Sequence, residues 1–258
     1  MDAPWRLLRH PPAAGDWNMA ADELLLQQAD GGHAPPCLRL YAWDRPTLSL
    51  GYFQSLDEIP PEARQRYAVV RRTTGGGAIL HHREVTYSVA VRRDCLDGTE
   101  LYDRANRALL LALSGLGAAV EIRGPQREDR AQRGPFFCFA RAGATDIIAP
   151  SCDQAKLAGS AQRRWHQAVL QHGSVLLESD EPGAVGLAAL LRRPVEFDEL
   201  AEQIIHGFQR EFACRFCRDD FSAAEFEQVE CIRRRRYGNP SWLARGNRKG
   251  LDELRSSP

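Results

Sequence analysis

The sequence of 258 residues lacks both an excess of one charge and a long apolar run. Its 34 basic residues balance 34 acidic ones, which excludes the global positive field that drives broad binding to nucleic acids or anionic membranes. The longest nearly apolar stretch, residues 108–120, is too short to span a bilayer. The amino terminus lacks the basic region, apolar core and cleavage site of a secretory signal. We therefore predict a cytoplasmic protein with no membrane or nucleic-acid partner, whose specificity comes from a local site.

Cysteine is too sparse for a disulfide framework. The seven cysteines are an odd number spread over a long chain, so reduced thiols are expected. The spacing Cys214-x-x-Cys217 is typical of metal sites, but no second pair follows it, and the sequence contains no His-x-x-x-His pair. We predict no metal, and interpret these cysteines as buried residues of a helix and a turn.

Lysine is almost absent, because arginine fills nearly every cationic position. The two lysines are Lys156, inside the segment AKLAGSAQRR, and Lys249, in a tail rich in glycine and arginine. Arginine stays protonated, whereas a lysine amine can shift its pKa and exchange a proton during a reaction. We interpret Lys156 as a candidate catalytic residue; the alternative is an ordinary lysine without chemistry.

Hydrophobic periodicity predicts strands scattered among helices with short connections. This pattern favours an α+β fold with a mixed or antiparallel β-sheet core flanked by helices over a doubly wound fold, which needs regular alternation. We expect a catalytic domain over residues 1–195 and a C-terminal helical extension, residues 196–258, packed on it. Residues 124–134 are predicted to be a mobile loop, and the tail from residue 238 to be partly ordered. The expected helices are 18–29 (capped by Asp16), 60–67, 101–116, 183–191, 197–212 and 223–237, and the expected strands are 37–43, 47–53, 69–72, 78–81, 86–91, 119–122, 136–139, 145–149, 157–161 and 168–177.

A glycine strip, Gly75 to Gly77, lies in the segment RRTTGGGAILHH. It matches neither the phosphate loop nor the dinucleotide-binding fingerprint. A backbone without side chains can approach an elongated ligand closely and offer N–H groups to a carbonyl or phosphate. The alternative is a purely structural tight turn that connects the strands expected over residues 69–72 and 78–81.

Three blocks in order, RRTTGGGAILHHREVTYSV, KLAGSAQRR and LQHGSVLL, resemble the lipoate and octanoate protein transferase/ligase family, relatives of the biotin protein ligases. The segments GYFQ and YGNPSW extend the likeness to nearly the whole chain. The resemblance implies a biotin/lipoate protein ligase-like fold whose sheet forms a tunnel for a medium-length acyl chain, with the glycine strip along the tunnel and Lys156 near the acyl carbonyl. The substrate-binding residues that the matched blocks imply are Arg71, Arg72, Thr74, Gly75, Gly76, Gly77, Ala78, His81, Gly159, Ser160, Ala161, His172 and Gly173.

Two chemistries occur in this family, and cysteine distinguishes them. The ligases activate free lipoate with ATP, whereas the octanoyltransferases receive the acyl group on a cysteine. The stretch CFARAGATDII, which Cys138 opens, resembles the segment that carries the acyl-thioester cysteine in the monomeric, Gram-positive type of octanoyltransferase. The segment PSCDQAK, which leads to Lys156, is longer than the corresponding link in this family and contains a second thiol. This thiol, Cys152, is an alternative nucleophile. A further alternative is that Cys138 is only a small buried hydrophobe.

The resemblance implies an acyltransferase that needs no cofactor. A lysine ammonium favours the thiolate of a neighbouring cysteine, whose free pKa is about 8.5. Cys138 would take octanoate from acyl carrier protein and pass it to a lysine of a lipoyl domain or glycine cleavage H protein. Backbone N–H groups near Gly159 and Ser160, or in the glycine strip, are candidates to hold the oxyanion. The alternatives are an ATP-dependent lipoate-protein ligase and a non-catalytic acyl-binding protein.

Overall fold

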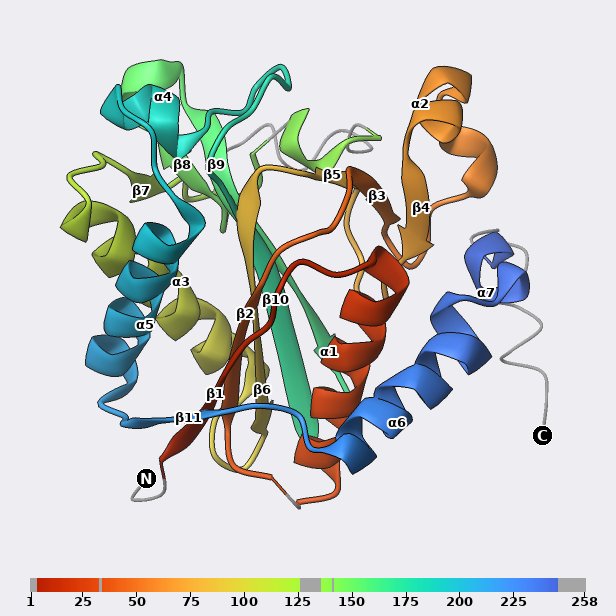
Figure 1. The fold of residues 1–258 in the computed structure, drawn as a ribbon. Coiled ribbons are helices and arrows are strands. Elements are labelled where there is room, and N and C mark those ends of the chain that lie inside the picture. Colours follow the sequence, from red (N-terminus) through yellow and green to blue (C-terminus); the bar gives the residue numbers. More distant parts are fainter. Residues whose placement is uncertain (1–3, 33, 126–135, 141, 246–258) are drawn as a thin grey trace.

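A large sheet with helices on both faces organises the computed structural model, which describes residues 4–32, 34–125, 136–140 and 142–245 (Figure 1). Within these residues the main sheet has eight strands in the order β11-β1-β2-β6-β10-β9-β8-β7, and a smaller sheet has the order β4-β3-β5. The strands are β1 (Trp5–Arg9), β2 (Cys37–Tyr41), β3 (Thr47–Leu50), β4 (Ala68–Arg71), β5 (Ile79–His81), β6 (Glu84–Arg92), β7 (Glu121–Ile122), β8 (Ile147–Ala149), β9 (Ala155–Arg164), β10 (Ala168–Leu176) and β11 (Phe216–Asp219). The α-helices are α1 (Gly15–Asp30), α2 (Pro61–Arg66), α3 (Gly98–Gly115), α4 (Leu187–Leu191), α5 (Phe197–Phe212), α6 (Ala223–Ile232) and α7 (Pro240–Ala244).

Strand pairing in the main sheet is mixed. β1 runs parallel to β2 and β11, whereas the other pairs, including β6 with β10 and β10 with β9, are antiparallel. The predicted α+β class with a mixed sheet is therefore confirmed. Most of the predicted loop, residues 126–134, and the end of the predicted tail, residues 246–258, lie outside the described residues.

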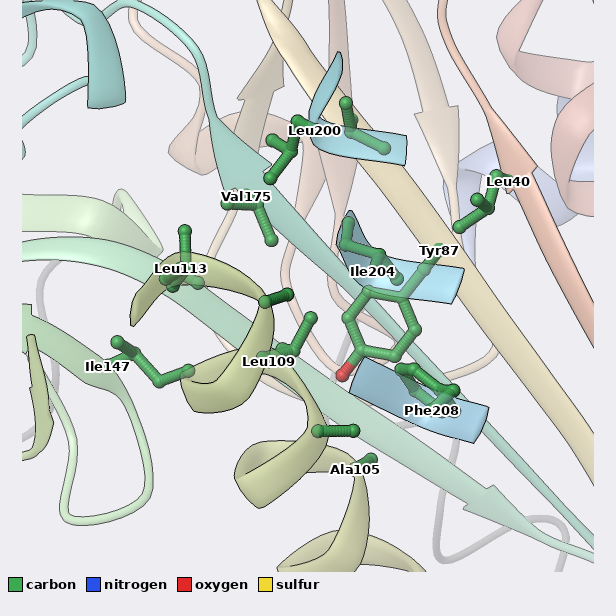
Figure 2. Close-up of a cluster of buried hydrophobic side chains, with 14 of the residues drawn as sticks. Leu40, Tyr87, Ala105, Leu109, Leu113, Ile147, Val175, Leu200, Ile204 and Phe208 are labelled. Atoms are coloured by element: carbon green, nitrogen blue, oxygen red, sulfur yellow. The ribbon is translucent and has the colours of Figure 1, made fainter. Parts of the chain in front are cut away.

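The two faces of the main sheet differ in chemistry, because side chains alternate along each strand. On one face Tyr87 and Val175 pack against α3 and α5 in a large apolar core (Figure 2). On the other face Thr86, Ser88 and Ser174 are buried beneath α1 and the small sheet although they are polar. Buried polar groups cost free energy unless they are hydrogen-bonded, so this polar layer marks the face on which a site is built.

Several sequence-based predictions are wrong in instructive ways. β1 was not expected, and β11 corrects the expectation of helices alone after residue 178. β11 is a short edge strand with three exposed residues, so its sequence FCRD carries no apolar alternation. Helix α1 begins after Ala14 rather than after the expected cap, Asp16, which lies in its first turn.

The glycine strip does not close a hairpin. β4 and β5 lie on opposite sides of β3, parallel and antiparallel to it respectively, so the segment between them crosses the end of β3. The expected strand over residues 136–139 is also wrong, because Phe137 forms only an isolated bridge with Ala78 and Cys138–Ala140 forms a 3-10 turn.

The segment after residue 195 packs on the same sheet. Helix α5 packs against α3, β11 joins the sheet edge, and α6 packs against α1. This segment therefore contains a strand and is not purely helical. The domain boundary at residue 195 stays a prediction.

Candidate active site

Cys138, Lys156 and Asp146 converge at one point. The Lys156 Nζ atom lies 3.4 Å from Cys138 Sγ, 3.3 Å from the Cys138 carbonyl oxygen and 2.7 Å from Asp146 Oδ2. Lys156 is 1% exposed, so its ammonium is nearly withdrawn from water. Asp146 is itself fixed, because its Oδ2 accepts a hydrogen bond from the Gly143 N–H at 2.6 Å. The ammonium of Lys156 thus contacts both the thiol of Cys138 and the carboxylate of Asp146.

Gly77, the last residue of the glycine strip, and the adjacent Ala78 position Cys138. The Ala78 N–H donates to the Phe136 carbonyl at 2.7 Å, and the Cys138 N–H donates to the Ala78 carbonyl at 2.7 Å. A Cβ at Gly77 would lie 2.9 Å from the Phe136 oxygen and 3.1 Å from the Cys138 nitrogen. A side chain at Gly77 would therefore force the backbone at Phe136 and Cys138 to shift, so this close approach favours glycine.

Strand β9 positions Lys156. The Lys156 N–H donates to the Gly183 carbonyl at 2.8 Å, and the side chain passes over Gly159, where a Cβ would lie 2.5 Å from Lys156 Cε. The ammonium also lies 4.7 Å from the centre of the Phe139 ring, on which a cation is attracted to the π face. The segment AKLAGSAQRR, singled out in the sequence, forms the whole of β9.

Lys156 remains charged although it is buried. Burial alone disfavours the ammonium, but the negative charges of the Cys138 thiolate and of Asp146 outweigh it and raise the pKa of Lys156 above its ordinary value. The ammonium therefore persists at neutral pH. It places a positive charge against Cys138 Sγ, 3.4 Å away.

A cavity extends from these residues between the main sheet, the small sheet and α1. It receives Gly159 and Ala161 from β9, His172 and Ser174 from β10, and Thr86 from β6. The other lining residues are Met19, Tyr41, Trp43, Arg72, Gly75, Gly76, Ile79, His81, Cys138, Phe139, Lys156, Ser160 and Gly173. Most of the predicted substrate-binding residues are therefore gathered around one cavity together with Cys138 and Lys156.

Arg72 holds the glycine strip in place. Its Nη2 atom donates to the carbonyls of Gly75 at 2.8 Å and Gly77 at 2.7 Å, and its Nη1 donates to the Ser49 carbonyl at 2.8 Å. Burial lowers the pKa of Arg72 to about 10, which leaves it charged at neutral pH. The Arg72 guanidinium therefore fixes the strip by hydrogen bonds and places a positive charge behind it, near Cys138.

Two histidines line the cavity in fixed orientations. His81 Nδ1 lies 2.7 Å from Glu84 Oε1, and burial lowers the pKa of His81, which favours the neutral ring. His172 bridges Asp22 Oδ2 at 3.1 Å and the Thr74 hydroxyl at 2.8 Å. Both rings are held by carboxylates behind the cavity wall and shape the wall.

Four of the predicted substrate-binding residues stand behind the cavity lining. Thr74 holds His172, and Gly77 and Ala78 place Cys138. Arg71 points elsewhere, because its guanidinium donates to the carbonyls of Gly51, Tyr52, Gln54 and Leu243. Arg71 thus ties the segment after β3 to α7.

The structure separates the two candidate nucleophiles. Cys152 ends a 3-10 turn, Pro150–Cys152, next to the apolar core, and it is absent from the described cavity lining. Asp146 was not predicted from the sequence, although it lies in the stretch CFARAGATDII. A carboxylate close in sequence to a rare lysine could have indicated it. Met19, Tyr41, Trp43, Ile79, Thr86, Phe139 and Ser174 were also missed.

Gly75 offers a clean probe of the glycine strip. A Cβ at Gly75 meets no atom within 4 Å, whereas Gly76 has a φ of +96° and a Cβ there would lie 3.0 Å from Arg72 Nη2. We expect Gly75→Val to fold normally but to slow acylation of Cys138 roughly tenfold, because the branched side chain takes cavity space. The measurement is the acylation rate by mass spectrometry, with Gly75→Ala as the graded control. A wild-type rate for the valine variant would reduce the strip to a structural connection.

Asp146 provides a second prediction. Asp146→Asn removes the charged acceptor of Lys156, so the buried ammonium is less favoured and less firmly oriented. We expect acyl transfer to fall about tenfold with an unchanged circular dichroism spectrum. The matched control is Asp103→Asn, on the exposed face of α3. Equal rates for the two variants would show that Asp146 does not act through Lys156.

The site combines a cysteine, a buried lysine and a carboxylate beside a cavity on one face of a mixed sheet. A family model, the lipoyl protein ligase A/B catalytic domain, matches residues 15–191, and the chain belongs to this family. This membership confirms the resemblance noted in the sequence.

Relatives and solved structures agree with this assignment. The chain is 33% identical to octanoyltransferase LipM of Symbiobacterium thermophilum, over 95% of this chain and 100% of the relative. It is 37% identical to octanoyltransferase LipM of Moorella thermoacetica, over 93% of this chain and 98% of the relative. The solved structure of a bipartite lipoate protein ligase from Thermoplasma acidophilum aligns with a TM-score of 0.76 at 22% identity, covering 95% of this chain and 98% of that one, and shows the same fold. Among the described residues no helix is long and apolar enough to cross a membrane.

Proposed function

We propose that this protein is an octanoyltransferase that takes an octanoyl group from acyl carrier protein onto Cys138 and passes it to a lysine of a lipoyl domain or glycine cleavage H protein. Octanoyl transfer is the activity named for relatives that match along nearly the whole chain. The observation that carries the role of Cys138 is the 3.4 Å contact between its Sγ and the buried ammonium of Lys156, beside a cavity. No cofactor is required by this chemistry.

The first half reaction exchanges one thioester for another. The Cys138 thiolate attacks the donor carbonyl, a tetrahedral oxyanion forms, and the carrier thiolate leaves with a proton from Lys156. The step is nearly neutral in free energy because the bond formed and the bond broken are of one kind.

The second half reaction drives the transfer. An acceptor lysine amine attacks the acyl-Cys138 carbonyl, the C–S bond breaks, and an amide forms. The amine proton passes to Lys156, which gave up its own proton in the first step, so the enzyme returns to its starting state. Two covalent steps at one site predict ping-pong kinetics.

The glycine strip is a better candidate for stabilising the oxyanion than the N–H groups near Gly159 and Ser160. Within the part of the chain that the structure describes, the N–H groups of Gly76 and Gly77 have no hydrogen-bond partner. Gly159 and Ser160 lie in β9, whose backbone N–H groups point along the plane of the sheet, toward β10 or away from it, rather than into the cavity on the face of the sheet. The charge of Arg72 behind the strip supports the same assignment.

Intact-mass analysis tests the proposal. Incubation of the protein with octanoyl acyl carrier protein, without ATP, should add one octanoyl group that hydroxylamine removes and that maps to Cys138. Subsequent addition of a lipoyl domain should remove the adduct and octanoylate the domain. Modification of the lipoyl domain only when ATP and free acid are supplied would contradict the transferase and favour a lipoate ligase. An adduct on Cys152 would move the nucleophile.

A further inference from the structure

Arg72 uses every N–H donor of its guanidinium inside the protein. Besides the carbonyls of Gly75 and Gly77, which Nη2 binds, its Nη1 atom donates to the Ser49 carbonyl at 2.8 Å and to the Ser49 hydroxyl at 3.2 Å. Its Nε atom donates to the Thr74 hydroxyl at 3.1 Å. A guanidinium has five N–H groups, and these five contacts occupy them. Arg72 can therefore orient a substrate only through its protein partners.

The contact with the Gly75 carbonyl fixes the direction of the next N–H group. A peptide bond is planar and trans, so its C=O and N–H point in opposite directions. The Gly75 carbonyl faces Arg72, and the Gly76 N–H of the same peptide therefore faces away from the guanidinium. Gly76 lines the cavity. The candidate oxyanion donor thus owes its direction to Arg72.

The contact with the Gly77 carbonyl acts on the nucleophile. Because this carbonyl faces Arg72, the Ala78 N–H of the same peptide points away from the guanidinium. That N–H donates to the carbonyl of Phe136, in the segment that continues to Cys138. Arg72 therefore orients both a candidate oxyanion donor and the segment that carries the thiol.

One buried arm joins Arg72 to β5 and β6. Arginine only donates, so the Ser49 hydroxyl accepts from Arg72, and its own proton is free for His81 Nε2, 2.7 Å away. Burial lowers the pKa of His81 and favours the neutral ring, which then carries its proton on Nδ1. Nδ1 lies 2.7 Å from Glu84 Oε1. The arm thus runs from a carboxylate through a ring and a hydroxyl to the guanidinium, and all its members are buried.

A second arm of the same chemistry joins Arg72 to β10 and α1. The Thr74 hydroxyl accepts from Arg72 Nε and lies 2.8 Å from His172 Nε2, and His172 Nδ1 lies 3.1 Å from Asp22 Oδ2. Asp22 is held in turn by Arg39, whose Nη1 lies 2.8 Å from Asp22 Oδ1. Elements of both sheets and helix α1 therefore brace one guanidinium.

We infer that Ser49 and Thr74 are positioning residues for acyl transfer, which fix Arg72 and through it aim the Gly76 N–H at the oxyanion. This inference rests on the proposed function, because it concerns the oxyanion of that reaction. Preorganised donors lower the barrier only while their direction is held. Both residues are absent from the described cavity lining. Their loss should therefore slow turnover without weakening substrate binding.

The test is octanoyl transfer from acyl carrier protein to a lipoyl domain, with kcat and KM determined separately. Thr74→Val, which is close in volume but lacks the hydroxyl, should lower kcat about tenfold and change KM less than about twofold. Ser49→Ala should have the same effect through the other arm, and it keeps the test valid if the valine variant unfolds. Thr74→Ser, which restores the hydroxyl, should recover most of the lost rate.

Thr47→Val is the matched control. Thr47 is buried on the same strand as Ser49, but its hydroxyl donates to the Arg45 carbonyl at 3.0 Å. This variant should transfer at nearly the wild-type rate. A wild-type kcat in both Thr74→Val and Ser49→Ala, an equal loss in Thr47→Val, or a Thr74→Ser variant as slow as Thr74→Val would overturn the inference.

Nuclear magnetic resonance of the imidazole nitrogens examines the arms independently of activity. We expect the Nδ1–H tautomer for both His81 and His172 in the wild-type protein, and a change at His172 alone in Thr74→Val. The Nε2–H tautomer at both rings would overturn the arms. Absence of loading in the wild-type protein, with both tautomers as expected, would contradict the transferase and leave the arms standing.

Discussion

Cys138→Ser is expected to abolish acyl transfer, with a loss of a thousandfold or more. The substitution hardly changes the volume of the side chain, so the 3-10 turn and the bridge to Ala78 should persist. A serine hydroxyl stays protonated at neutral pH and is a much weaker nucleophile than a cysteine side chain. The measurement is octanoylation of a lipoyl domain by mass spectrometry under initial-rate conditions, together with the thermal unfolding midpoint.

Cys152→Ser is the matched control for this result. Cys152 contacts the apolar core outside the described cavity lining, so its serine variant should transfer at nearly the wild-type rate. Appreciable transfer by Cys138→Ser, or its loss in Cys152→Ser with an intact fold, would reverse the assignment of the nucleophile.

Lys156→Arg is expected to reduce turnover about a hundredfold or more. The substitution keeps the positive charge but replaces a titratable amine with a group that does not release its proton. The structure adds a steric reason, since Lys156 is 1% exposed and passes close to the backbone of Gly159. The larger guanidinium cannot occupy the position of the ammonium between Asp146 and Cys138 unchanged.

Alkylation of Cys138 as a function of pH separates charge from proton transfer. Because the pKa of Lys156 is raised, its positive charge stays beside Cys138 Sγ throughout the neutral range. Lys156→Met, of similar length but neutral, should shift alkylation to higher pH. Lys156→Arg should retain much of the low-pH alkylation yet still transfer slowly. Wild-type turnover in the arginine variant would refute a role for Lys156 in moving protons.

The helices and the central strands could be predicted because local pattern specifies them. Helix α5 spans residues 197–212 as predicted, since its apolar residues repeat along one face. The strands β6 and β10 were expected close to their observed positions, over residues 86–91 and 168–177, and β6 is rich in β-branched residues. Strand β11 was not predicted, because an exposed edge strand needs no apolar face.

The neighbours Arg71 and Arg72 show the limit of sequence reasoning. They are the same residue type in one motif, but Arg72 braces the glycine strip beside the cavity, and Arg71 binds carbonyls next to α7. Successive residues of an extended chain point in opposite directions. The sequence indicates this alternation but does not reveal what covers each side.

The sequence by itself determined the chemical types present: a rare lysine in AKLAGSAQRR, a glycine strip, and a cysteine in CFARAG. Only the tertiary structure decided that Cys138 rather than Cys152 meets Lys156, and that Asp146 completes the group. It also decided which residues line the cavity beside this group. The physical reason is that strand register and helix packing join residues far apart in the chain through long-range contacts, which local propensity does not encode.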